Sequence, residues 1–202
     1  MLINKMYAWR GYDSGFKVGD RPDQMTLVAS DYRVGTAIGT LTIGIDGSDG
    51  LLADAIYHSE ADALRDNGAR LCEMIKFAVE RSVNSKRLLG ALFHVAFIFA
   101  FYIHERTDIL IEVTPQHSRF YRHLLGFEVL GDVRLNPRVN TEGVLMRLPL
   151  IFAADQISRF GGLGEASTER SLYPYAFSER EERGVIERLK RLEVLSGDPP
   201  SA

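Results

Sequence analysis

Apolar and polar residues follow two different spacings along this chain, and these spacings predict its strands and helices. Residues 71–79 form a nearly continuous apolar run that follows the turn-forming pair Asn67 and Gly68. Such a run is typical of a strand buried on both faces in the middle of a sheet that helices cover. Further strands are predicted at residues 26–29, 35–45, 108–114, 128–135 and 143–150, and helices within residues 51–64, at 86–105, after Pro115 and at 179–195.

Residues 108–127 carry the most informative order of elements: a strand, a polar turn, a helix with Phe120 and Tyr121, and an exit into another strand. Pro115 cannot continue a strand ladder and suits the first turn of a helix. Gly126 lies where a helix commonly ends in a left-handed residue. Taken along residues 26–150, the order predicts a mixed α/β sheet with a strand–helix–strand crossover at its centre.

The character of the sequence changes after residue 150, so we expect one domain over residues 1–150 and a C-terminal extension over residues 151–202. Ser178 and Glu181 have the spacing of a capping box, which predicts the start of the helix at 179–195. Its narrow apolar stripe indicates either docking on the same domain or a contact with a second subunit, as in a homo-oligomer. Both interpretations remain open.

Composition excludes several classes of protein. The 202 residues have a formal net charge of -3, which lacks the basic excess of a general nucleic-acid-binding protein. Cys72 is the only cysteine, so no internal disulfide can form and a reducing compartment is expected. The first residues lack a secretory signal pattern, which favours the cytoplasm. The apolar run 88–103 is shorter than the ~18 residues of a spanning helix, so we expect a buried central helix and no integral membrane span.

Glu73 is the strongest candidate for acid–base chemistry. With regular alternation it shares a strand face with Leu71, Ile75, Phe77 and Val79, so the pattern places a carboxylate among apolar neighbours. Burial disfavours the charged form and raises a carboxyl pKa toward neutrality, where it can accept a proton from an ammonium group. The alternative is a glutamate at a strand end that pairs with a lysine or arginine.

Other polar residues are weaker candidates. Glu112 either orients a substrate or completes an ion pair, and Tyr121 either donates a proton or packs against the sheet. His117 and His123 are six residues apart, which is a poor spacing for one metal on a helix, so no metal site is expected.

The stretch 80–90 precedes the long helix and is basic. Arg81, Lys86 and Arg87 can hold a phosphate group there, and Gly90 is the only glycine of this stretch. Basic side chains at a helix start oppose the helix dipole, which favours a role in binding a partner. A solvated basic turn is the alternative.

Several segments together resemble the bacterial N-acyl amino acid synthases, a branch of the GNAT acyltransferase superfamily. They cover roughly residues 25–150. The matching segments are residues 34–41, 71–79, 85–93 (SKRLLGALF), 111–127 and 134–140 (RLNPRVN), of which the last is the most specific. The resemblance implies a GNAT-like, mostly antiparallel central sheet. Where the superfamily has a glycine-rich loop for coenzyme A, this chain has the basic stretch instead.

The resemblance also implies a reaction: transfer of a long-chain acyl group from an acyl-carrier-protein thioester to the α-amine of an amino acid, such as tyrosine. The acyl donor, on carrier protein or coenzyme A, is then a co-substrate, and no cofactor is tightly bound. The resemblance implies acid–base catalysis for Glu73 and a position near the thioester sulfur for Tyr121. It also implies an acyl-chain wall formed by Phe77, Leu92 and Phe93. Arg134 or Arg138 is implied to bind the carboxylate of the amino acid.

Two other functions compete with this one. The first is an N-acetyltransferase that uses acetyl-coenzyme A, and the missing glycine-rich loop argues against it. The second is a non-catalytic domain that binds acyl lipids or a partner protein.

Overall fold

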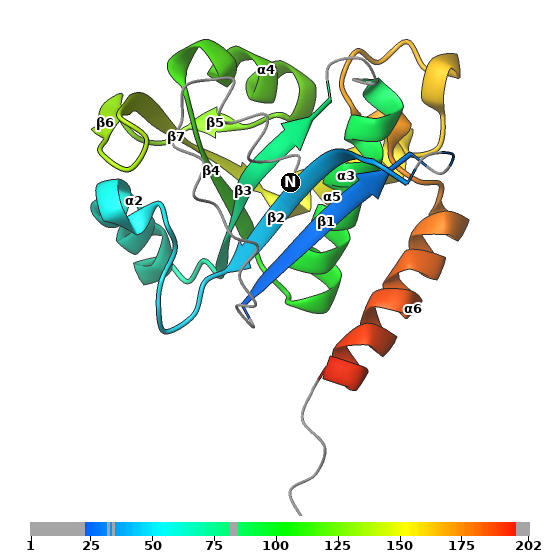
Figure 1. The fold of residues 1–202 in the computed structure, drawn as a ribbon, viewed down its shortest axis with the longest axis horizontal. Coiled ribbons are helices and arrows are strands. Elements are labelled where there is room, and N and C mark those ends of the chain that lie inside the picture. Colours follow the sequence, from blue (N-terminus) through cyan, green and yellow to red (C-terminus); the bar gives the residue numbers. More distant parts are fainter. Residues whose placement is uncertain (1–22, 32, 34, 81–84, 197–202) are drawn as a thin grey trace, which may run out of the picture.

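The computed structural model describes residues 23–196 except residues 32, 34 and 81–84. Within these residues, seven strands form one mixed sheet in the order β1-β2-β3-β4-β7-β5, with β6 paired to β7 (Figure 1). The pair β3 and β4 is parallel and the other pairs are antiparallel, so the expected mixed, mostly antiparallel sheet is confirmed. The strands are β1 Gln24–Ser30, β2 Ala37–Ile45, β3 Leu71–Val79, β4 Asp108–Val113, β5 Glu128–Val129, β6 Arg134–Asn136 and β7 Thr141–Pro149.

Helices cover both faces of the sheet. One face packs against α2 around the fully buried Tyr57, and the opposite face packs against α3, α4 and α5 in a larger core. The α2 side is therefore the smaller of two apolar layers, and Figure 1 shows α2 separated from the other helices. The helices are α2 Asp54–Asp66, α3 Lys86–Ile98 with a π-helical continuation Phe99–Ile103, α4 Pro115–Leu125, α5 Leu150–Phe160 and α6 Glu179–Ser196; short 3-10 turns lie at Gly164–Ala166 and Tyr173–Tyr175.

A bulge in β3 changes which side chains share a face. Lys76 has a left-handed φ of 52°, and the register with β2 shifts between Thr40 and Thr42. Alternation therefore inverts, because an extra residue on one strand turns the following side chains over. Phe77 and Val79 pack in the α3-side core together with Met74, while Leu71 packs on the α2 side. The prediction that Glu73, Phe77 and Val79 share one face is thus wrong.

The parallel strands β3 and β4 separate shortly after they begin to pair. Their ladder contains Leu71 with Asp108, Cys72 with Ile109 and Glu73 with Leu110. Beyond this point β3 continues alongside β2, and β4 continues alongside β7 as far as Val113. Figure 1 shows the two strands diverging toward α4. Glu73 is the last residue of β3 that pairs with β4, so it lies where the sheet begins to open.

The C-terminal extension is part of the same core rather than a separate unit. The helix α5 follows β7 without a loop, and Ala153 and Ile157 are buried in the α3-side core. His94 of α3 accepts a 2.8 Å hydrogen bond at Nδ1 from the backbone N–H of Phe177. These contacts join the extension to the sheet domain.

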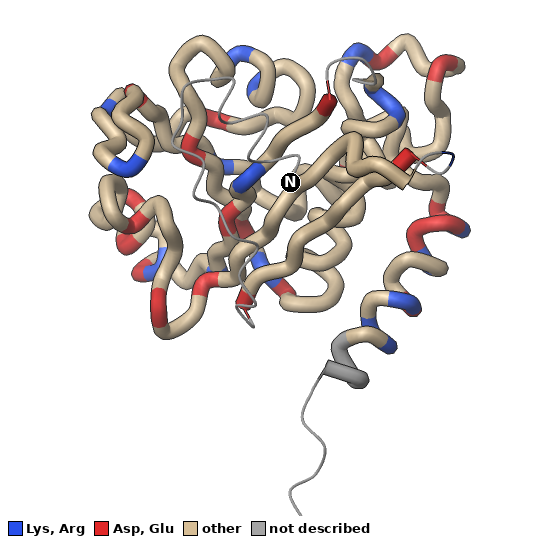
Figure 2. The backbone as a smooth tube through the Cα atoms, viewed as in Figure 1, with Lys and Arg blue, Asp and Glu red and all other residues tan. Residues whose placement is uncertain are grey.

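The helix α6 begins as its sequence predicts. Ser178 donates from its backbone N–H and its hydroxyl to Glu181 Oε2, at 2.9 and 2.6 Å, so the glutamate caps the helix start as it does in a capping box. Val185, Ile186 and Leu189 pack against the α3-side core, while basic and acidic residues are interspersed along the rest of the helix (Figure 2). One face of α6 therefore docks on its own domain.

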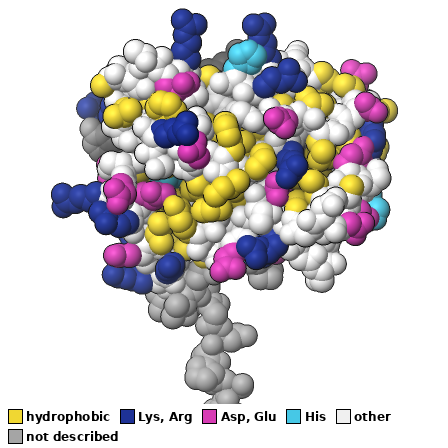
Figure 3. Space-filling model, turned by 180° about the vertical axis from the view of Figure 1, so that it is seen from behind, with side chains coloured by type: hydrophobic (Ala, Val, Ile, Leu, Met, Phe, Trp, Pro, Cys, Tyr) yellow, Lys and Arg dark blue, Asp and Glu magenta, His cyan; other side chains and the backbone are white. Residues whose placement is uncertain are grey.

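The long apolar helix packs inside the protein. Within the described part of the chain, residues 86–103 form the one helix long and apolar enough to span a membrane, and 56% of it is buried. The helix ends two residues before the predicted boundary at residue 105, and Leu89, Leu92 and Phe93 are buried as expected for a central helix. From behind, a band of hydrophobic side chains crosses the surface between charged ones (Figure 3).

Candidate active site

Glu73 is buried on the α2 side of the sheet, with 4% of the residue exposed. Its Oε1 accepts a 2.7 Å hydrogen bond from the backbone N–H of Leu52, and its Oε2 accepts a 3.1 Å bond from that of Ala53. Across the ladder its partner is Gly44, which lies beside the Glu73 side chain. Within the described part of the chain, the carboxylate is therefore held at a fixed place by backbone amides and not by a cation.

Burial raises the pKa of Glu73 to about 7, against the lowering effects of the Leu52 and Ala53 N–H groups and of Arg138. Asp54 acts in the same direction as burial. A carboxyl group with a pKa near 7 is present in both protonation states at neutral pH. It is therefore suited to accept and return a proton during a reaction.

A second polar group lies on the same face, one strand away. Glu112 of β4 accepts a 2.7 Å hydrogen bond from Nδ2 of Asn136, and its Oε2 lies 3.8 Å from the Arg138 guanidinium. Asn136 is itself buried, and its Oδ1 accepts the backbone N–H of Arg138 at 2.9 Å. The RLNPRVN segment thus brings Arg138 to the sheet beside Glu112 and within electrostatic range of Glu73.

Arg134 belongs to a different set of contacts. Its guanidinium donates to the Ile56 carbonyl at 2.7 Å, pairs with Glu60 and stacks over the Tyr57 ring at 4.8 Å. These bonds fasten β6 to α2. Of the two arginines proposed for carboxylate binding, Arg138 is the one with the weaker internal pairing.

Tyr121 lies on α4, which begins with Pro115 and ends at Gly126 in the left-handed conformation with φ 84°. The residue is 9% exposed and packs edge-on against Phe127 at 5.9 Å. It belongs to the α3-side core, whereas Glu73 lies on the α2 side. The two predicted catalytic residues therefore lie on opposite sides of the sheet.

An apolar pocket lies behind the sheet, between α3, α5 and the segment 172–176. The empty space in and around the pocket is about 500 Å³, a figure that includes open solvent. Phe93 lines it, and Phe77 packs on Phe93 at 5.2 Å. Leu92 points elsewhere, toward Gly39 of β2. The lining of the pocket is apolar, as in cavities that bind hydrophobic ligands.

The basic start of α3 is only partly described. Arg81 lies outside the described residues, while Lys86 and Arg87 are exposed on the first turn. Lys86 Nζ lies 5.5 Å from the centre of the Tyr175 ring. Gly90 is buried against Tyr175, whose carbonyl would lie 2.7 Å from a Cβ at this position. A close contact between α3 and the extension accounts for this glycine.

Among the described residues, no group of three or more His, Cys, Asp or Glu side chains could hold a metal ion. The arrangement that the structure offers is instead a buried carboxyl group, a strand opening and an apolar pocket.

Comparison with known proteins identifies the family. The model of the N-acyl amino acid synthase FeeM family matches residues 1–149. The chain belongs to the FeeM family of N-acyl amino acid synthases. It is therefore an acyltransferase that acts on an amine, and its acyl donor is a co-substrate rather than a tightly bound cofactor.

Solved structures agree with membership of the FeeM family. FeeM, an N-acyl amino acid synthase from uncultured soil microbes, is 28% identical with a TM-score of 0.66, over 74% of this chain and 87% of that one. A putative N-acetyltransferase from Lactobacillus plantarum (16% identity, TM-score 0.53, 74% and 86% covered) and TofI (14%, 0.51, 73% and 80%) share the fold. No protein with a curated description matches the chain.

Three features of this FeeM-family site were not predicted from the sequence. They are the Leu52 and Ala53 amides that hold Glu73, the bond from Asn136 to Glu112, and the pocket wall from α5 and residues 172–176. Backbone amides leave no mark in a sequence. The apolar spacing of residues 150–160, however, is helical and would have revealed α5.

Proposed function

We propose that this chain transfers a long-chain acyl group from an acyl-carrier-protein thioester to the α-amine of an amino acid. The observation that carries the proposal is the place of Glu73: a buried carboxyl group with a pKa of about 7, at the point where β3 and β4 separate. A thioester that enters between these strands has its carbonyl group close to this carboxylate.

The chemistry needs an unprotonated amine. An amino acid arrives mainly as the ammonium form, and Glu73 accepts its proton, directly or through a water molecule. The amine nitrogen then attacks the thioester carbonyl carbon, the C–S bond breaks, and the thiolate leaves. Tyr121 donates a proton to that thiolate, and the second proton that the nitrogen releases on becoming an amide returns through water to the Tyr121 phenolate; no covalent enzyme intermediate forms.

The pocket behind the sheet suits the acyl chain. Its lining is almost entirely apolar, which suits a hydrocarbon chain. Phe93 forms one wall, and Phe77 supports Phe93 from β3. We assign the chain to this pocket, so the C-terminal extension completes the acyl site.

The acceptor carboxylate pairs with Arg138. The Arg138 guanidinium lies 3.8 Å from Glu112 Oε2, which is longer than a hydrogen bond, and 44% of the Arg138 side chain is exposed. A guanidinium can therefore turn toward a substrate and bind its carboxylate with a forked pair of bonds. Arg134 is already held by Glu60 and the Ile56 carbonyl.

The exposed Lys86 and Arg87 form the basic surface that we assign to the acidic carrier protein. Arg81, which lies outside the described residues, stays a candidate from the sequence. Acyl-coenzyme A is the alternative donor. The reaction is proposed to take place in the cytoplasm, where both donors occur, and the exposed face of α6 is proposed to contact a second copy of the chain.

The donor assignment is tested by offering the purified protein palmitoyl-carrier protein, palmitoyl-coenzyme A and acetyl-coenzyme A in separate assays with a mixture of amino acids. Mass spectrometry then identifies any N-acyl amino acid. We expect the fastest product formation with the carrier-protein donor, and a loss of that preference in the double variant Lys86→Glu, Arg87→Glu. Turnover of acetyl-coenzyme A alone would contradict the proposal.

A further inference from the structure

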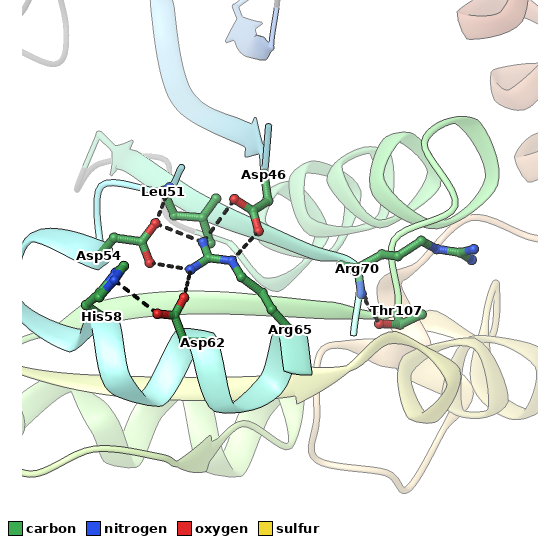
Figure 4. Close-up of polar contacts among 8 residues, drawn as sticks. All are labelled: Asp46, Leu51, Asp54, His58, Asp62, Arg65, Arg70 and Thr107. Atoms are coloured by element: carbon green, nitrogen blue, oxygen red, sulfur yellow. Dashed lines mark hydrogen bonds and ion pairs between the residues drawn. The ribbon is translucent and has the colours of Figure 1, made fainter. Parts of the chain in front are cut away.

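The loop between β2 and α2 holds the two amides that contact Glu73. One arginine side chain, that of Arg65, binds both ends of this loop. Arg65, near the end of α2, donates from Nε and Nη2 to Asp46 at 2.8 and 3.0 Å. It donates from Nη1 and Nη2 to Asp54 at 3.0 and 2.8 Å, and also reaches Asp62 at 2.8 Å (Figure 4). One guanidinium thus joins three carboxylates.

Asp46 and Asp54 lie at the two ends of this loop. Asp46 follows β2 directly and Asp54 is the first residue of α2, so a guanidinium bound to both fixes the loop at its beginning and its end. Asp54 Oδ2 also accepts the backbone N–H of Leu51 at 2.7 Å, next to the residues whose amides hold Glu73. Forked bonds of this kind depend on the planar shape of arginine.

We propose that Arg65 is a positioning residue, which bridges Asp46 and Asp54 so that the Leu52 and Ala53 amides stay directed at the Glu73 carboxylate. The inference rests on the proposed role of Glu73 as the base. The Arg65 side chain contacts neither Glu73 nor the proposed substrate sites, so it acts through the loop.

The charged groups around Glu73 make the effect measurable. Asp54 on α2 raises the pKa of Glu73, and Arg138, after β6, lowers it. Arg138 in turn pairs with Glu112 on β4. The neighbouring Cys72 thiol stays neutral because burial raises the pKa of that thiol. Both amide hydrogen bonds favour the ionised carboxylate. Loss of their alignment therefore raises the pKa of Glu73.

The test is Arg65→Lys, which keeps the positive charge but cannot form forked bonds with two carboxylates. Carboxyl ¹³C NMR of glutamate-labelled protein gives the pKa of Glu73, whose signal is the one missing in Glu73→Gln. We expect the pKa of Glu73 to rise by about one pH unit, and the midpoint of the acidic limb in the pH profile of kcat/KM to move up by the same amount. Arg159→Lys, which alters the exposed pair with Asp155 on α5, is the control and should move neither.

Two results would overturn the inference. One is an unchanged pKa of Glu73 together with an activity loss of the same size at every pH, which a purely structural role produces. The other is loss of folding, by thermal unfolding, in both Arg65→Lys and the milder variant Asp46→Asn. The NMR titration needs no turnover, so a wild-type protein that makes no product would reject the proposed function while leaving the effect of Arg65 on Glu73 measurable.

Discussion

The side-chain Nδ2 of Asn136 donates a 2.7 Å hydrogen bond to Glu112 Oε1, and both groups lie on the same face of the sheet as Glu73. A Cβ on Gly143 of β7 would lie 2.5 Å from the same oxygen, so this position needs glycine to leave room for Glu112. The bond therefore fixes Glu112 Oε1 and leaves Oε2 toward Arg138. The geometry makes Arg138 a reversible partner of Glu112.

The first prediction follows from this arrangement. In Arg138→Lys the forked pair with the acceptor carboxylate is lost, so we expect KM for the amino acid to rise about 10-fold to 100-fold, with a smaller change in kcat. Initial rates at varied amino acid concentration measure this. Arg134→Lys serves as the comparison: it weakens the contact with Glu60 and should lower the melting temperature more than it changes KM. The opposite pattern would exchange the two roles.

Stability should depend on pH through Glu73. Because its pKa in the folded state is about 7, above the value of ~4.5 in an unfolded chain, the folded state binds more protons between these values. The contribution of this group to stability is therefore present at low pH and lost as pH rises through 7. We expect the free energy of unfolding of wild type, relative to Glu73→Gln, to fall by about 3 kcal/mol from pH 4.5 to pH 8. Urea unfolding of both proteins measures it, and no change with pH would refute the shifted pKa.

The acyl pocket can be made smaller from α5. Ala153 is buried and lines the pocket, so Ala153→Leu fills part of the space without adding a polar group. We expect a shift of preference toward shorter acyl donors, measured as the ratio of kcat/KM for C16 and C10 chains. Ala166→Leu, at an exposed position of the extension, is the matched control. An unchanged ratio in Ala153→Leu would place the chain elsewhere.

Tyr121 can be tested with little disturbance of packing. Tyr121→Phe keeps the ring contact with Phe127 but removes the hydroxyl group. If this hydroxyl protonates the departing thiolate, kcat falls about 10-fold to 100-fold, and donors with more acidic thiols are affected less. Tyr102→Phe, at an exposed tyrosine, should retain full activity. Equal losses with all thiols would assign Tyr121 to packing alone.

The sequence predicted the elements more reliably than the faces of β3. Strands, the central helix and the capping box of α6 follow from spacing and capping residues, which act locally. The bulge at Lys76 does not, because a lysine with positive φ carries no sequence signal. Phe77 consequently packs on the side opposite to the one that alternation predicts.

Site residues divide in the same way. Glu73 was predictable because a carboxyl group in an apolar strand is conspicuous on its own. The contacts of Arg65 and Asn136 were not, because their partners Asp46, Asp54 and Glu112 are 11 to 24 positions away in the chain and become neighbours only through the fold.

The most direct measurement for the whole account is the pH dependence of kcat/KM for acyl transfer by wild type and Glu73→Gln, with exposed Glu142→Gln as the control. We expect kcat/KM of wild type to rise with pH through a midpoint of about 7. In Glu73→Gln, kcat/KM should fall about 100-fold or more and should no longer rise with pH through this midpoint. A Glu73→Gln variant that keeps both the rate and the limb of the wild type would contradict the account.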